Sequence, residues 1–243
     1  MKKLSPLIVA LDVETMREVE AVLRRLGSAV DFYKVGLKLF THYGPDAVKW
    51  LRRKRKRVFL DLKLHDIPNT VAEACREAVR LKVDMLTLHA SGGSEMMKMA
   101  AAAAKAEARK IKSPQPYLMA VTVLTSMDSL SELGLEASPA EQVLRLARLA
   151  QGSGMSGVIC SPQEISLIRG GLPRSFKVVT PGVRPVGADK GDQKRVKTPE
   201  EAFADGADAV VVGRPILQAV NPRQVVAEIL GLSFQGAKRR VIR

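Results

Sequence analysis

A charged pair interrupts an apolar run near position 60. The run from Val58 to Lys63 is apolar except for Asp61 and Lys63. Side chains two residues apart on a strand share a face, so both charges should point one way and the neighbouring leucines the other. With Lys34 from a nearby run and Asp66 from the following loop, two carboxylates and two ammoniums can alternate. Such a cluster suits electrostatic and proton-transfer catalysis, and an internal salt-bridge network is the alternative.

Two later segments have the features of an anion site. A polar stretch follows Thr180, and Gly213 and Arg214 lie between an apolar run and a helix-like segment. Glycine lets backbone N–H groups approach an anion, a helix N-terminus favours negative charge, and Arg214 would add a bidentate contact. A single Gly-Arg pair would by itself indicate only a turn. Barrels often bind phosphate after strands seven and eight, however, so we expect phosphate here.

The segment 183–197 between these two features is long and polar for a connector, and it contains Gly187 and Gly191. Long loops in compact domains are often functional. We expect a lid on the phosphate side, with Gln193 as its best-placed uncharged donor.

Short apolar runs and segments of helical spacing alternate along the whole chain. The expected strands are 7–12, 32–36, 58–63, 85–89, 117–124, 157–160, 177–181 and 209–213. The expected helices are 16–26, 45–53, 70–82, 95–110, 139–151, 164–170, 199–205 and 216–230, with Asn69 and Thr198 as N-caps. Eight such units in about 250 residues predict an α/β fold, a closed (βα)8 TIM barrel. An open doubly wound sheet is the alternative, but no glycine-rich dinucleotide turn follows the first run.

Length and composition favour one basic domain. The chain has 243 residues, 46% of them hydrophobic, and 39 Lys and Arg against 25 Asp and Glu give a net charge of +14. We therefore expect a single barrel over 1–243 that ends in a basic tail at 233–243. No apolar run approaches the roughly 18 residues of a membrane span, and no secretory signal is evident. Cys75 and Cys160 lie far apart without a metal-ligand pattern, so a cytoplasmic protein with reduced thiols and no metal is expected.

The motif around the charged pair resembles a known signature. The segment Asp61–Val71, DLKLHDIPNTV, closely resembles that of the bacterial orotidine 5′-phosphate decarboxylase family, except that Leu64 stands where an aromatic residue is common. Further segments that resemble this family occur in order, namely Leu7–Asp12, Tyr33–Gly36, His89–Gly93, Val123–Ser126, Val179–Arg184, Gly191–Arg195 and Gly206–Pro215.

The resemblance implies a cofactor-free decarboxylase that converts orotidine 5′-monophosphate (OMP) to UMP, the last step of de novo pyrimidine synthesis. Lys63 would protonate C6, and Lys34, Asp61 and Asp66 would complete the catalytic network. A homodimer is implied as well, in which Asp66, Ile67 and Thr70 enter the partner's site. The implied substrate contacts are Asp12 and Lys34 on the ribose, Thr125 and Ser126 on the pyrimidine edge, Gln193 between base and phosphate, and Arg184, Gly213 and Arg214 at the phosphate. Pro181 is expected to be a substrate-binding residue as well.

Two other interpretations compete with this one. Sugar-phosphate decarboxylases and aldolases of a related barrel class carry a similar Asp-x-Lys-x-x-Asp strand but hold an enediolate with magnesium. The basic run Arg52–Arg57 and the tail could instead bind nucleic acid. With 4% aromatic residues there is little platform for base stacking, so we expect no specific nucleic-acid partner.

Overall fold

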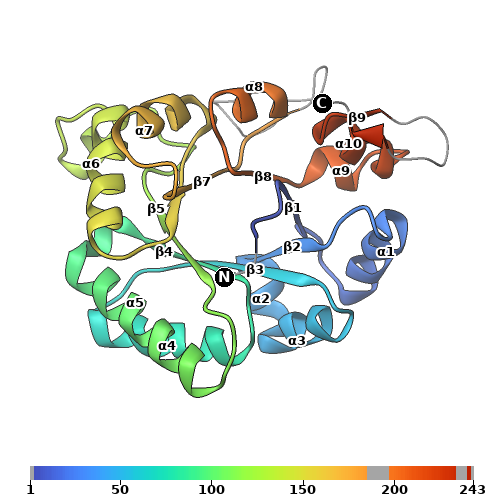
Figure 1. The fold of residues 1–243 in the computed structure, drawn as a ribbon, viewed down its shortest axis with the longest axis horizontal. Helices are drawn as coiled ribbons and strands as arrows, with labels where there is room; N and C mark the ends of the chain where they lie inside the picture. Colours follow the sequence, from blue (N-terminus) through green and yellow to red (C-terminus); the bar gives the residue numbers. More distant parts are fainter. Residues whose placement is uncertain (1–2, 185–196, 234–239, 242–243) are drawn as a thin grey trace.

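Eight parallel strands close into a barrel in the computed structural model, which describes residues 3–184, 197–233 and 240–241 (Figure 1). The barrel strands are β1 (Leu7–Ala10), β2 (Phe32–Gly36), β3 (Arg57–Leu64), β4 (Met85–His89), β5 (Tyr117–Val121), β6 (Gly157–Ile159), β7 (Lys177–Thr180) and β8 (Ala209–Val212). Each strand pairs with its neighbour in sequence, and β1 pairs with β8, with Ile8 opposite Val211. The predicted TIM barrel is confirmed.

Helices surround the strands on the outside (Figure 1). They are α1 (Met16–Leu26), α2 (Leu37–Tyr43), α3 (Pro45–Arg53), α4 (Pro68–Arg80), α5 (Gly93–Lys110), α6 (Pro139–Gly152), α7 (Ile165–Gly171), α8 (Pro199–Ala204), α9 (Arg214–Leu217) and α10 (Pro222–Ile229). Short 3₁₀ turns occur at Ala90–Gly92, Ser131–Leu133 and Pro162–Glu164. A two-stranded antiparallel pair, β9 (Leu232–Ser233) with β10 (Arg240–Val241), lies in the predicted basic tail.

Three helix predictions need correction. The segment after β2 forms an additional helix, α2, which Gly44 at φ +55° separates from α3. The predicted helix 216–230 is divided into α9 and α10, with Asn221 capping the second through Gln224 N–H. Helix α4 starts at Pro68 with Ile67 at the N-cap position, so Asn69 lies inside the helix, because proline suits the first helical turn. The predicted cap at Thr198 is confirmed by a capping box with Glu201.

The alternation of side chains on the strands divides the core into two layers. Inward-facing residues fill the barrel interior; they are Ile8, Ala10, Phe32, Phe59, Met85, Tyr117, Met119, Val121, Ile159, Val179, Ala209 and Val211. A larger outer layer joins the other strand faces to the helices and includes Leu60, Leu86 and Leu88. Because the strands are covered on both faces, most are apolar throughout, as expected for a parallel sheet. Polar residues gather where the strands end.

Several predicted strands end one to three residues earlier than expected. Strand β1 ends at Ala10, β5 at Val121 and β8 at Val212. Asp12, Thr125 and Gly213 therefore lie on the loops that follow the strands. This is the face on which barrel enzymes carry their chemistry.

No helix in the described part of the chain is long and apolar enough to cross a membrane. Cys75 and Cys160 are both buried and free. Burial raises the pKa of the Cys75 thiol to about 12.

Gly157 at the start of β6 provides a test of the barrel packing. A Cβ atom there would lie 2.1 Å from the backbone oxygen of Lys177 on β7, and a strand backbone cannot move aside without disturbing the sheet. Gly157→Ala should therefore lower the free energy of unfolding by about 1–3 kcal/mol. Gly152→Ala is the matched control, because a Cβ atom at Gly152 would have no heavy atom within 4 Å. This substitution should leave the free energy of unfolding unchanged or raise it. Urea denaturation measures both, and equal stabilities would contradict the packing.

Candidate active site

A cavity of about 270 Å³ opens at the C-terminal ends of the strands. Its floor is apolar and comes from the interior layer of the barrel, including Ala10, Phe59, Ile159 and Val211. The remaining lining is polar or made of turn residues. Nine residues singled out from the sequence lie here together, namely Asp12, Lys34, Asp61, Lys63, Thr125, Pro181, Arg184, Gly213 and Arg214.

The charged side chains form an alternating series across three strands. The Lys63 Nζ lies 2.9 Å from Asp61 Oδ1, and the Lys34 Nζ lies 3.5 Å from Asp61 Oδ2. Lys34 Nζ is also 3.4 Å from Asp12 Oδ1. The order is therefore Asp12, Lys34, Asp61, Lys63. Within one chain, Asp12 takes the place in this series that the residue pattern assigned to Asp66.

Asp61 is the buried member of this series. Its side chain is 11% exposed, against 56% for that of Asp12. Burial acts to raise the pKa of the Asp61 carboxyl, but the charges of Lys34 and Lys63 and hydrogen bonds from Lys63 and Thr87 outweigh it. The net result is a pKa below the usual value, so Asp61 is ionised at neutral pH.

Lys63 has an unusual backbone for a strand residue. Its φ is +50°, whereas the other described non-glycine residues with positive φ, Arg55, Lys82 and Lys112, each follow a helix. The pairing of β3 with β4 slips at the same point, because Leu60 pairs with Leu86 and Leu64 pairs with Leu88. Such irregularities re-aim side chains and often occur beside active sites.

Thr87 is a site residue that nothing in the sequence singles out. It is fully buried on β4, its hydroxyl lies 2.9 Å from Asp61 Oδ1, and it accepts a hydrogen bond from the Lys63 backbone N–H at 2.9 Å. Threonine is common in strands, and this one stands between two leucines in a strand of five residues. The regular pairing of Leu60 with Leu86 places Thr87 beside Asp61, and the slip that follows brings the Lys63 N–H to the Thr87 hydroxyl.

The opposite side of the cavity comes from the ends of β7 and β8. Gly182 has φ +77°, and Gly213 is the N-cap of α9. A Cβ atom on Gly213 would lie 3.1 Å from Asp12 Oδ2, so glycine keeps this wall close to the carboxylate. Arg184 and Arg214 bring positive charge to the same cavity.

The predicted lid is described only at its two ends. Val183 and Lys197 form a parallel bridge, and the Arg184 N–H donates to the Lys197 carbonyl at 3.0 Å. The ends of the segment are thus joined beside the cavity. Gln193 and the rest of 185–196 lie outside the described residues.

Four predicted site residues lie outside the cavity lining of their own chain. Asp66, Ile67, Thr70 and Ser126 are absent from it. All four are exposed; the first three follow β3 directly, and Ser126 lies on the loop after β5. The Asp66 carboxylate accepts a hydrogen bond from the Ile67 N–H at 2.7 Å, and the Ile67 residue is 67% exposed. In the single chain, Asp66, Ile67 and Thr70 therefore face solvent.

Two histidines stand next to the charged series. The rings of His65 and His89 lie 5.4 Å apart. The pKa of His89 is lowered, first by burial and then by the charges of His65 and Lys63. Among the residues that the structure describes, no group of three or more His, Cys, Asp or Glu could hold a metal ion.

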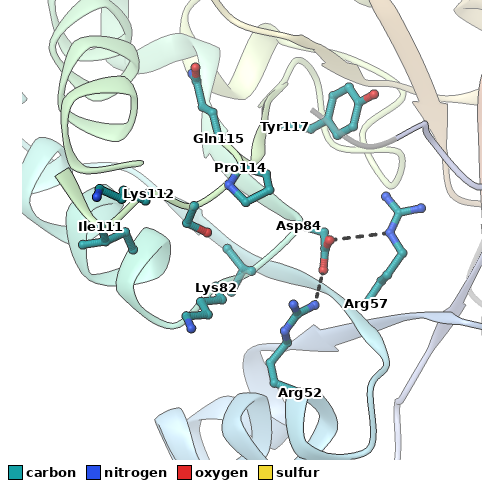
Figure 2. A pocket seen from close by; sticks show the side chains of 11 residues that line it. Arg52, Arg57, Lys82, Asp84, Ile111, Lys112, Pro114, Gln115 and Tyr117 are labelled. Atoms are coloured by element: carbon teal, nitrogen blue, oxygen red, sulfur yellow. Dashed lines mark hydrogen bonds and ion pairs between the residues drawn. The ribbon is translucent and has the colours of Figure 1, made fainter. Parts of the chain in front are cut away.

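A second cavity, of about 240 Å³, lies at the opposite end of the barrel (Figure 2). Its centre is Asp84, which pairs with Arg52 at 2.7 Å and with Arg57 at 3.6 Å. Figure 2 shows the Lys82 and Lys112 side chains directed away from Asp84. The two arginines therefore serve a structural ion pair at the N-terminal face, where residues of barrel proteins usually contribute to stability.

The same contacts explain half of the basic run that suggested nucleic acid. Arg52 and Arg57 hold Asp84, and the Lys56 ammonium donates to the carbonyls of Gly27 and Val30 at 3.0 and 2.8 Å. These three side chains are partly buried. The run is thus built into the barrel wall rather than presented as one continuous basic surface.

Comparisons with known proteins agree with the geometry. The family model described as "Orotidine 5'-phosphate decarboxylase / HUMPS family" matches residues 5–229. An orotidine 5'-phosphate decarboxylase from Moorella thermoacetica is 50% identical over 230 residues, which cover 92% of this chain and 91% of that protein. One from Haemophilus influenzae is 50% identical over 231 residues, with 93% and 97% covered. The crystal structure of orotidine 5'-phosphate decarboxylase from Lactobacillus acidophilus superposes with a TM-score of 0.81 at 39% identity, covering 93% of this chain and 97% of that one. The chain therefore belongs to the orotidine 5'-phosphate decarboxylase / HUMPS family.

Proposed function

We propose that this protein decarboxylates OMP to UMP, as its relatives are named to do, with its own charged side chains and without a metal or organic cofactor. The observation that carries the proposal is the Lys63 ammonium 2.9 Å from the buried Asp61 carboxylate, in a cavity that also holds Arg184 and Arg214. A nucleotide monophosphate offers one anionic end to the arginines and its base to the charged pair.

The chemistry requires charge stabilisation at one carbon. Loss of CO₂ from C6 leaves an electron pair in an orbital that the pyrimidine ring cannot delocalise. The Lys63 ammonium pairs with this developing charge and then transfers its proton to C6, so the C–C bond electrons end in a C–H bond. In this proposal the substrate carboxylate binds beside Asp61, whose repulsion disfavours the bound substrate relative to the transition state.

The other end of the nucleotide supplies binding energy. Arg184, Arg214 and the Gly213 backbone bind the phosphate, and Asp12 and Lys34 contact the ribose hydroxyls. Thr125, Ser126 and Gln193 recognise the base. Contacts remote from C6 can order the charged groups and support closure of the segment 183–197.

A homodimer completes this proposal. Asp66, Ile67 and Thr70 are exposed on the loop and helix that follow β3, where they can reach a second subunit. In the dimer, Asp66 adds the second catalytic carboxylate to the partner's series.

The first prediction concerns the reaction itself. The purified protein should convert OMP to UMP at the same rate with and without EDTA, followed by the change in ultraviolet absorbance. Lys63→Ala should lower kcat by at least about 10⁴-fold, because it removes both the proton donor and the charge. Lys49→Ala, an exposed lysine on α3 paired with Asp46, is the control and should be unaffected.

Three results would reject the proposal: an inactive wild type, an active and folded Lys63→Ala variant, or activity abolished by EDTA and restored by magnesium. The last result would instead favour the magnesium-dependent sugar-phosphate class.

The second prediction tests the shared site. Lys63→Ala and Asp66→Asn homodimers should each be inactive, but hybrid dimers carry one site with both residues intact. Mixing the two variants under conditions of subunit exchange should therefore restore about a quarter of wild-type activity at most, since half of the dimers are hybrids and each hybrid has one intact site of two. No recovery after exchange has been verified by mass spectrometry would contradict the role of Asp66 across the interface.

The third prediction follows from the lowered pKa of Asp61. A carboxyl group whose pKa is lower in the folded state than in the unfolded state stabilises the protein at pH values above its unfolded-state pKa, about 3.9. This stabilisation is lost as the pH falls through the pKa of the folded state. As the pH is lowered from 5 until Asp61 is protonated, the free energy of unfolding should therefore fall by more in wild-type protein than in Asp61→Asn. Urea denaturation over a pH series measures this, and parallel curves would show that Asp61 has no lowered pKa.

A further inference from the structure

We propose that Thr87 is a positioning residue, whose hydroxyl fixes both Asp61 and Lys63 in the geometry that decarboxylation requires. This inference rests on the proposed function. It concerns a residue of β4 that bears no charge and is fully buried. Thr87 does not line the cavity, so it acts through its two neighbours.

The hydrogen bonds of Thr87 have a defined direction. The Lys63 backbone N–H can only donate, so the Thr87 oxygen accepts at 2.9 Å. The hydroxyl proton is then free to point at Asp61 Oδ1, 2.9 Å away, which as a carboxylate can only accept. The same Oδ1 atom also accepts from the Lys63 ammonium at 2.9 Å.

These three bonds form a closed ring. It runs from the Lys63 backbone to the Thr87 hydroxyl, on to the Asp61 carboxylate, and back through the Lys63 ammonium. Lys63 is thereby held at its backbone and at the tip of its long side chain by a single unit. The other carboxylate oxygen, Oδ2, remains directed to Lys34 at 3.5 Å.

The ring lies where regular strand pairing fails. Between the pairs Leu60 with Leu86 and Leu64 with Leu88, β3 has three intervening residues and β4 has one, Thr87. The Thr87 hydroxyl takes over as acceptor for the Lys63 N–H at this point. A non-glycine residue at φ +50° persists in a strand only when its surroundings hold it, and this bond is such a constraint.

The consequence for catalysis is specific. Without the hydroxyl, Asp61 can rotate about its side-chain torsions, and Lys63 can relax toward an ordinary strand backbone. A misplacement of about 1 Å can cost about 100-fold in rate. Arg184, Gly213 and Arg214 follow β7 and β8, away from β3 and β4, so phosphate binding should persist.

The test is a pair of substitutions at position 87. Thr87→Val keeps the shape but removes the hydroxyl, and it should lower kcat about 10- to 100-fold while KM for OMP stays within about threefold of wild type. Thr87→Ser keeps the hydroxyl and should recover most of kcat. A merely structural threonine would show neither this kcat-against-KM split nor the rescue by serine.

A matched control is available next to β5. Thr122 is a buried threonine, as Thr87 is, and it directly follows the last residue of β5. Its hydroxyl donates a hydrogen bond to the Ile159 carbonyl at 3.1 Å. Thr122→Val also removes a buried hydroxyl and should cost stability in urea, yet it should keep kcat. Unchanged kcat in folded Thr87→Val, an equal fall in Thr122→Val, or no rescue by serine would overturn the inference.

Amide hydrogen exchange separates this inference from the function on which it rests. The Lys63 amide should exchange faster in Thr87→Val than in wild type or Thr87→Ser, whether or not OMP is turned over. An inactive wild type with this exchange pattern would reject the decarboxylase and leave the ring in place. An active wild type with equal exchange in all three proteins would reject the ring alone.

Discussion

The arrangement of side chains at the C-terminal ends of β2, β3 and β4 depends on one carboxylate that is held between two ammonium groups. Transfer of an ionised group from water into a protein is costly unless its charge and hydrogen bonds are matched, and Asp61 meets both conditions through Lys34, Lys63 and Thr87. Each partner comes from a different position on β2, β3 or β4, so adjacent strands must be in register for the cluster to exist. The barrel supplies this register, and the cluster places charged side chains on β2 and at the end of β3, where they line the cavity.

The fold and the charged pair were accessible from the sequence because both depend on local periodicity. Alternating strand and helix segments predict the barrel, and the two-residue spacing places Asp61 and Lys63 on one face. Thr87 was not singled out, because its contact with the Lys63 backbone, 24 residues away in the chain, depends on a slip in the pairing of β3 with β4 that no local pattern reveals. Helix α2 was missed since its seven residues are too few for a clear period. The role of Asp66 across a dimer interface stays a prediction, because no pattern or contact within one chain determines a partner.

The two ends of the barrel use the same residue types for different purposes. At the N-terminal face, Arg52 and Arg57 surround Asp84, and this cluster ties α3 and the start of β3 to the start of β4. At the C-terminal face, lysines surround Asp61 beside an open cavity. Arginine in the first case gives fixed, directional pairing, whereas lysine in the second gives a compact charge that can lose a proton. The distinction supports a structural role for one cluster and a chemical role for the other.

The apolar layer inside the barrel also bears on how small molecules leave the cavity. Phe59, Met85 and Met119 fill the interior beneath the charged pair, and each is at most 1% exposed. In the proposed reaction, CO₂ would be released above this closely packed floor, and the cavity mouth at the C-terminal ends of the strands would be its exit as well as the entrance for the nucleotide. Both products of the proposed reaction would then share one exit, so the order in which they leave would depend on how that single opening is filled.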